Sequence, residues 1–142
     1  MRFKLIIDGD ADEEIVAHVR AESALTDELR RICEDMCEEI IGYRGNEATV
    51  LSPSEICCFT VDGGKVVAIT ENGTYTVKQR LYQLDGRLSG FVFINQSCLA
   101  NVKRIKRFDV SVGGSLRVTF TCGHTDYVSR RCLKAVKERF GI

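Results

Sequence analysis

Apolar and polar residues alternate in two short segments near the start of the chain, and the spacing then becomes helical. Arg2–Asp8 and Ile15–Val19 have the two-residue period of β-strands, and the acidic stretch between them is typical of a turn. From Thr26 to Ile41 apolar residues recur every three or four positions, which predicts a helix capped by Thr26 and stopped by Gly42. The first part of the chain therefore predicts two strands and a helix.

Beyond this helix the spacing predicts short strands separated by tight turns. Glycine pairs mark two hairpins, one across Gly63-Gly64 and one across Gly113-Gly114. Ser129 and Gly141 are the residue types that begin and end a helix. The expected strands are 47–51, 56–61, 65–70, 74–77, 91–94, 105–112, 115–121 and 125–128, and the expected helices are 78–88 and 130–140.

The formal net charge of zero is an average over two oppositely charged parts. Residues 1–40 contain 5 Lys/Arg and 12 Asp/Glu, a balance of −7, whereas residues 41–142 contain 15 and 8, a balance of +7. The segment from Phe91 onward holds 10 Lys/Arg and 3 Asp/Glu and carries this whole excess. Such asymmetry favours a polyanion-binding part with an acidic appendage. The alternative is that the two parts only neutralise each other.

Length and composition fit a soluble globular chain of one domain, or of one domain with a small N-terminal unit. Neither a charged-then-apolar leader nor an apolar run of about 18 residues is present. The cysteines number 7, and Cys57 and Cys58 are adjacent, which favours buried reduced thiols over a disulfide framework. We therefore expect a cytoplasmic protein.

Two polar clusters in the basic part carry chemistry that suits nucleic acids. In the first, Asn95, Gln96 and Ser97 follow a predicted strand, and Asn or Gln amides can bond an adenine edge. In the second, Arg130 and Arg131 begin a helix, where guanidinium groups and unbonded backbone N–H groups together suit a phosphate. The basic run between the clusters comprises Asn101, Lys103, Arg104, Lys106 and Arg107.

Each cluster also has an ordinary structural interpretation. A loop of Asn, Gln and Ser often bonds its own backbone, and Asn101 fits the same role. Two arginines on a short helix can be a solvated charged pair. The run from Lys103 to Arg107 equally fits an edge strand whose charges prevent pairing with other chains. The residues alone leave both interpretations open.

Taken together, these motifs resemble the LytTR DNA-binding domain. In residues 91–105 an aromatic strand leads into a polar triplet, an apolar stretch and a basic segment, as in that family. Residues 127–131, followed by a short amphipathic helix, are similar to the family's closing motif. Residues 56–59 and the helix around 81–84 also fit, so the resemblance covers roughly residues 44–142.

The resemblance implies a mainly β fold with short helices, α+β overall. An elongated β sandwich at 44–142 would bind DNA, and residues 1–43 would form an acidic strand–helix extension that is a candidate for dimerisation. The implied function is a sequence-specific transcriptional regulator that inserts loops into the major groove of promoter DNA. The residues expected at the DNA are Lys65, Asn95, Gln96, Asn101, Lys103, Arg104, Lys106, Arg130 and Arg131.

The same resemblance implies which partners the protein has. They are double-stranded DNA, a second copy of the chain, and a membrane protein encoded nearby that would act as controller. We expect no cofactor, no metal and no small-molecule substrate.

Other classes of function compete with this one. An enzyme is disfavoured because the two histidines lie in no metal or triad motif, and Cys33 and Cys37 belong to an apolar helix stripe. A thiol-based redox sensor would require Cys58 or Cys98 near the basic cluster, where cations lower the pKa of a thiol. A non-enzymatic interaction module would instead bind an acidic protein on the basic surface.

Overall fold

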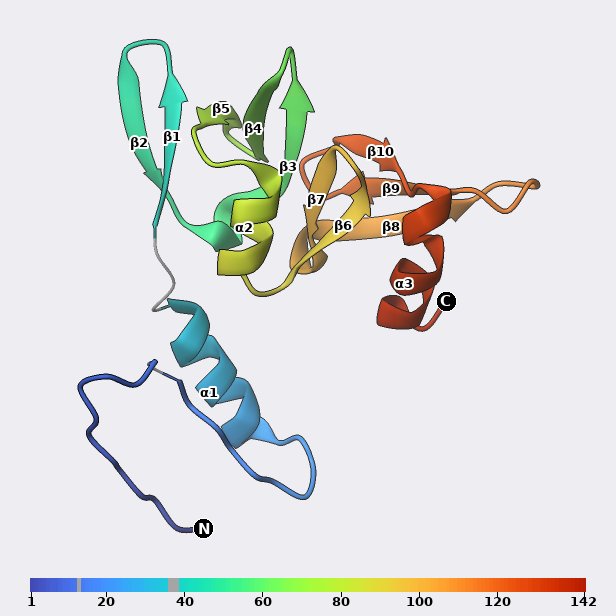
Figure 1. Ribbon diagram of the computed structural model, residues 1–142. Helices are drawn as coiled ribbons and strands as arrows, with labels where there is room; N and C mark the ends of the chain where they lie inside the picture. Colours follow the sequence, from blue (N-terminus) through green and yellow to red (C-terminus); the bar gives the residue numbers. More distant parts are fainter. Residues whose placement is uncertain (13, 36–38) are drawn as a thin grey trace. The chain divides into compact units, whose positions relative to one another are not determined.

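The computed structural model describes residues 1–12, 14–35 and 39–142 (Figure 1). The chain forms two compact units, Met1–Met36 and Cys37–Ile142. Over the described ranges it has three α-helices and ten strands, and all of these strands lie in the second unit. The expected fold class, mainly β with short helices, is confirmed.

The N-terminal unit contains one helix, α1 (Ala24–Asp35). A reciprocal pair of hydrogen bonds closes its first turn. The Ser23 N–H donates to Thr26 Oγ1 over 2.8 Å, and that hydroxyl donates to the Ser23 carbonyl over 2.8 Å. The helix therefore begins before Thr26, and Ser23 is its capping residue.

The two strands predicted before α1 are absent from the described residues 1–12 and 14–23, so that prediction is wrong. Alternation marks a segment that can line a sheet, but two short strands alone are only marginally stable. The apolar side chains of Phe3 and Ile7 accordingly remain exposed. The Cys33 thiol is also exposed, whereas the apolar stripe predicts that it is buried; Cys37 lies outside the described residues.

The second unit begins with strand β1 (Ile40–Arg44), where the sequence predicts the end of a helix. Burial explains the difference, because Ile40 is 1% exposed and belongs to the core of this unit. Gly42 lies within the strand, where an added Cβ would come within 2.7 Å of the Tyr75 Cβ. Gly42 is thus required for close packing and is not a helix stop.

Seven antiparallel strands form the larger sheet, in the order β2-β1-β5-β4-β3-β7-β6, and three form a smaller sheet, in the order β10-β9-β8. The remaining elements are β2 (Glu47–Leu51), β3 (Ile56–Asp62), β4 (Lys65–Thr70), β5 (Gly73–Val77), α2 (Leu81–Arg87), β6 (Phe91–Asn95), β7 (Cys98–Asn101), β8 (Ile105–Val110), β9 (Leu116–Phe120), β10 (Thr125–Tyr127) and α3 (Arg130–Phe140), with 3-10 turns at Pro53–Glu55 and Val102–Arg104. Besides β1, the sequence misses only β7 among these strands.

Strands β3, β6 and β7 form the middle layer of this unit, between α2 on one side and the smaller sheet with α3 on the other (Figure 1). Successive residues of a strand point to opposite faces. Phe59 and Leu99 therefore join the cluster that contains α2, while Cys58 and Cys98 join the cluster of the smaller sheet and α3. Both faces of these strands are buried, so they are the most enclosed part of the fold.

Helix α3 ends the fold as predicted. The Ser129 Oγ accepts a hydrogen bond from the Cys132 N–H over 3.3 Å, and Gly141 closes the helix in the left-handed region at φ 68°. The rings of Phe140 and Phe108 lie 4.8 Å apart, edge to face. This contact holds the end of α3 against the smaller sheet.

Candidate nucleic-acid interface

Backbone hydrogen bonds join three turns of the second unit: the β3–β4 hairpin turn, the β6–β7 turn and the first turn of α3. The Val61 N–H, at the end of β3, donates to the Ser97 carbonyl over 3.1 Å and ties the β3–β4 hairpin to the β6–β7 turn. The Ser129 N–H donates to the Ile94 carbonyl over 2.8 Å and ties the start of α3 to the same turn. The hairpin, the turn and the helix start therefore meet at one end of the unit.

The β3–β4 hairpin presents a basic side chain beside a bare backbone tip. Gly63 and Gly64 both have positive φ, 57° and 78°, as the two central residues of a type I′ turn require. The first residue after the tip is Lys65, whose side chain is exposed. Neither glycine would place a side chain between Lys65 and a ligand.

The β6–β7 turn is shaped by the Asn95 side chain. Its Nδ2 donates to the Tyr127 carbonyl over 2.8 Å and to Asp126 Oδ1 over 3.1 Å, and its Oδ1 accepts from the Ser97 N–H over 2.8 Å. The amide thus bonds the turn on one side and strand β10 on the other. Gln96, at the tip, is exposed.

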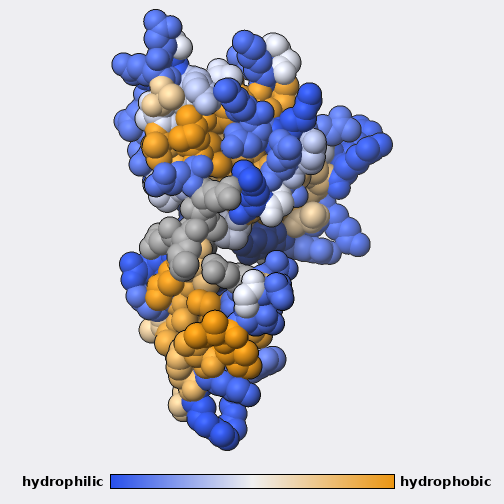
Figure 2. Space-filling view, turned by 60° about the vertical axis from the view of Figure 1, so that its left-hand side comes forward, coloured by the Kyte–Doolittle hydropathy of each residue, from blue (hydrophilic) through white to orange (hydrophobic). Residues whose placement is uncertain are grey.

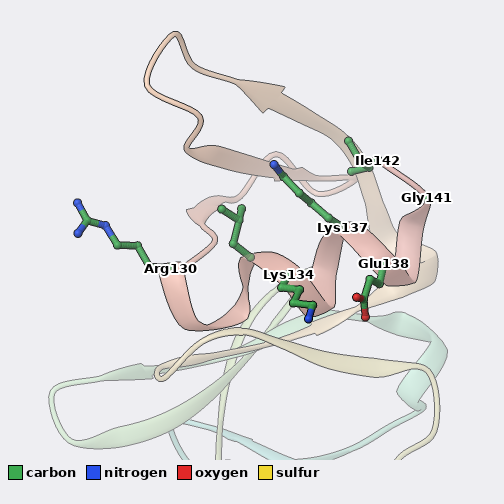
Figure 3. A pocket seen from close by; sticks show the side chains of 7 residues that line it. Arg130, Lys134, Lys137, Glu138, Gly141 and Ile142 are labelled. Carbon is green, nitrogen blue, oxygen red and sulfur yellow. The ribbon is translucent and has the colours of Figure 1, made fainter.

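The start of α3 places two exposed arginines next to this turn. Arg130 and Arg131 occupy the first turn of the helix, directly after Ser129. Figure 3 shows the neighbouring surface of α3, where Arg130, Lys134 and Lys137 surround an open hollow. Arg130 and Arg131 place two cations on the first turn of α3, beside its unbonded N–H groups, which suits phosphate groups.

The remaining predicted residues lie around the connection from β7 to β8, at the end of β7 away from the β6–β7 turn. Asn101 is 4% exposed, its Nδ2 donates to the Ile56 carbonyl over 2.8 Å, and its Oδ1 accepts from the Lys103 N–H over 3.1 Å. Arg104 donates from Nε to the Ser54 carbonyl over 2.8 Å. Lys106 is exposed at a bulge of edge strand β8. Asn101 and Arg104 thus bond the backbone of other segments, while Lys106 lies on a sheet edge.

The structure therefore divides the predicted set into two groups. The first group lies on the three joined turns and comprises Lys65, Asn95, Gln96, Arg130 and Arg131. The second group lies between the end of β7 and the start of β8 and comprises Asn101, Lys103, Arg104 and Lys106. Sequence reasoning misses Asp126, which accepts from the Asn95 amide and from the Tyr127 N–H, over 2.7 Å. Its bond to Asn95 joins residues 31 positions apart, so no local pattern reveals it.

Cys58 and Cys98, the two thiols that a redox sensor would use, lie inside the second unit. Cys57, Cys58 and Cys98 are buried. The hydrogen bond between the Cys98 and Cys58 thiols, together with burial, raises the pKa of Cys98 far above its ordinary value. Burial likewise raises the pKa of Cys122 to about 11. A raised pKa disfavours the thiolate, so the geometry gives no support to the redox sensor.

Within residues 1–12, 14–35 and 39–142, no group of three or more His, Cys, Asp or Glu side chains could hold a metal ion. Within the same ranges no helix has the length and apolar character needed to cross a bilayer.

Comparison with known proteins links this geometry to one family. A family model described as the LytTr DNA-binding domain matches residues 46–141. Proteins of Staphylococcus aureus strains NCTC 8325 and COL, named as uncharacterized HTH-type transcriptional regulators, are 33% identical over 109 residues, which is 76% of this chain and 74% of theirs. A solved LytTr DNA-binding domain from Bacillus cereus has the same fold, with a TM-score of 0.69 at 17% identity over 73% of this chain and 97% of that domain.

Proposed function

This chain belongs to the family of LytTR DNA-binding domains, and on that premise we propose that its second unit reads duplex DNA with three turns. The observation that carries the proposal is the pair of backbone bonds, Val61 to Ser97 and Ser129 to Ile94, that holds these turns together. Helices α2 and α3 are separated by five strands, so they cannot form a helix-turn-helix unit, which needs a turn of about 3–4 residues.

Each exposed side chain on the turns has a role that its chemistry suits. The Gln96 amide would bond an adenine edge in the major groove, and Arg131 would bond a guanine edge or a phosphate. Lys65 and Arg130 would contact phosphates on either side, with the N–H groups of the first turn of α3 assisting Arg130. Asn95 and Asp126 would act as positioning residues, because their polar groups bond inside the protein.

At the level of the cell, we propose that the protein is a cytoplasmic transcriptional regulator that binds promoter DNA as a homodimer. The similar proteins from Staphylococcus aureus are named as HTH-type transcriptional regulators. A membrane protein encoded nearby would control it. The chemistry of the surface requires no cofactor.

Selection of bound duplexes from a random pool, followed by affinity measurements on the selected site, tests the reading of DNA. We expect log affinity to fall linearly with log salt, by about 0.9 per phosphate neutralised. Gln96→Ala should weaken binding by about 1–3 kcal/mol and relax the preference at one base pair, because it removes a contact to a base edge. Lys65→Ala should weaken all sequences alike and lower the salt slope by about 1.

Lys106→Ala is the matched control, since it removes an equal charge near the start of strand β8, outside the three turns. Its salt slope should stay within error of the wild-type value. A pool that yields no enriched sequence, or a Lys106→Ala loss as large as that of Lys65→Ala, would contradict the proposal.

A further inference from the structure

The N-terminal unit leaves an unusually large share of its apolar side chains exposed. Figure 2 shows hydrophobic residues gathered on its surface. Phe3 is 89% exposed, Leu5 71% and Ile7 90%, and these three share one face of a segment with a two-residue period. The large apolar residues of this unit that are at least 41% exposed are Met1, Phe3, Leu5, Ile6, Ile7, Ile15, Val16, Val19, Leu25 and Ile32.

This unit is too small to bury these side chains by itself. A chain of fewer than about 40 residues rarely forms a hydrophobic core without a metal, disulfides or association. The strand-patterned segment Arg2–Asp8 lies outside every sheet of the described structure, and its Asp8 carbonyl accepts a backbone hydrogen bond from the Ala11 N–H over 3.3 Å. An Asx turn, in which the Asp10 N–H donates to Asp8 Oδ1 over 3.0 Å, marks the end of the segment.

We propose that Arg2–Asp8 pairs antiparallel with the same segment of a second copy, about a two-fold axis at Leu5. The sequence of the segment is complementary to itself in that register, as an isologous contact requires. Arg2 of each copy lies opposite Asp8 of the other, Phe3 lies opposite Ile7, and Leu5 faces its own copy. The ribbon then carries ion pairs at both ends of one face and six apolar side chains on the other.

Helix α1 supplies the surface that covers this apolar face. Leu25, Leu29 and Ile32 follow one side of the helix at spacings of four and three residues. Leu25 is 42% and Ile32 41% exposed, so the stripe still has apolar surface to bury. A two-stranded ribbon packed against helices is stable where an isolated ribbon is not.

Charge opposes two other occupants of this surface. The balance of −7 over residues 1–40 opposes contact with anionic membrane lipids or with DNA. Most of the acidic residues follow Asp8, whereas Arg2–Asp8 itself holds two basic residues and one acidic residue. Opposite charges therefore meet within the ribbon, and the acidic excess lies outside it.

A charge-swap experiment on the full chain tests this register by sedimentation velocity without DNA. Arg2→Asp brings two carboxylates opposite each other at both ends of the ribbon, and Asp8→Arg brings two guanidinium groups together there. Each variant alone should therefore dimerise about tenfold more weakly than wild type, or worse.

An equimolar mixture of the two variants, and the double variant Arg2→Asp/Asp8→Arg, should recover dimers. The mixture pairs opposite charges in its mixed dimers, and the double variant pairs them at both ends. Val112→Asp, on an exposed loop of the second unit, is the control and should dimerise like wild type.

The proposal deepens the homodimer of the proposed function, and the two can fail separately. Binding of each variant to a single half-site, at concentrations where the wild type is monomeric, should equal that of wild type. A monomeric wild-type chain, single variants that dimerise normally, or a mixture without recovery would overturn the ribbon even if DNA binding is normal. If the wild-type chain binds no DNA while the single variants lose dimers and the mixture recovers them, the DNA reading is overturned and the ribbon stays in place.

Discussion

At the scale of single residues, Asn95 shapes the candidate interface through its own hydrogen bonds. Its amide makes three hydrogen bonds that join the β6–β7 turn to β10, and these use both of its N–H donors. The sequence permits either a structural or a base-reading role for Asn95, and these bonds favour the structural one. Asp126 shares this network, and only the folded chain brings it next to Asn95.

We predict that Asn95→Ala lowers the free energy of unfolding by about 1–3 kcal/mol, because the half-buried Asn95 amide makes three hydrogen bonds that alanine cannot replace. Urea unfolding followed by circular dichroism measures the change. Gln96→Ala is the control on the neighbouring residue, and it should stay within about 0.5 kcal/mol of wild type because Gln96 is exposed. Equal losses in the two variants would show that Asn95 does not hold the turn.

At the scale of elements, the tip of the β3–β4 hairpin depends on a backbone conformation that few residues adopt. Gly63 has φ 57° with open space around its Cα, so the limit on substitution there is conformational and not steric. We predict that Gly63→Val destabilises the protein by about 1–2 kcal/mol, whereas Gly63→Asn is close to neutral, since Asn tolerates the left-handed region. Thermal unfolding of both variants checks the difference. A Gly63→Asn loss as large as that of Gly63→Val would point to a contact at the tip instead.

The elements also show how far local patterns reach. Hairpins with glycine turns, such as β3–β4, and helix α3 with its Ser129 and Gly141 caps follow from nearby residues, and the sequence predicts them. Strand β1 is missed because its apolar residues continue the helical spacing of α1, and burial of Ile40 in a distant core decides its structure. Strand β7 is missed because four residues, Cys98–Asn101, are buried on both faces and show no alternation.

At the scale of the whole molecule, the two units differ in how much of their surface they bury. The middle strands β3 and β7 lie between two apolar clusters, whereas residues 1–12 lie in no sheet. Amide exchange follows the free energy of opening, which is highest in such enclosed strands. The opposite charge of the two parts is visible in the sequence, but which basic residues meet at one end is decided by sheet topology.

We predict that in hydrogen exchange the amides of β3 and β7 are the slowest and those of residues 1–12 the fastest, when the chain is dilute. Peptide-resolved mass spectrometry measures the order. Edge strand β2 is the internal reference, because it is paired on one side only and should exchange faster than β7. Slower exchange in β2 than in β7 would contradict the central place of the middle strands.

The bonds that join the three turns have a consequence for how such a protein changes over time. Both bonds, from Val61 to Ser97 and from Ser129 to Ile94, use main-chain groups that almost any amino acid supplies. On the DNA reading that we propose for Gln96 and Arg131, new side chains at these two positions would alter which promoters are recognised while the platform beneath them keeps its shape. A lineage carrying this fold would then acquire new target genes through single substitutions, without first rebuilding its scaffold.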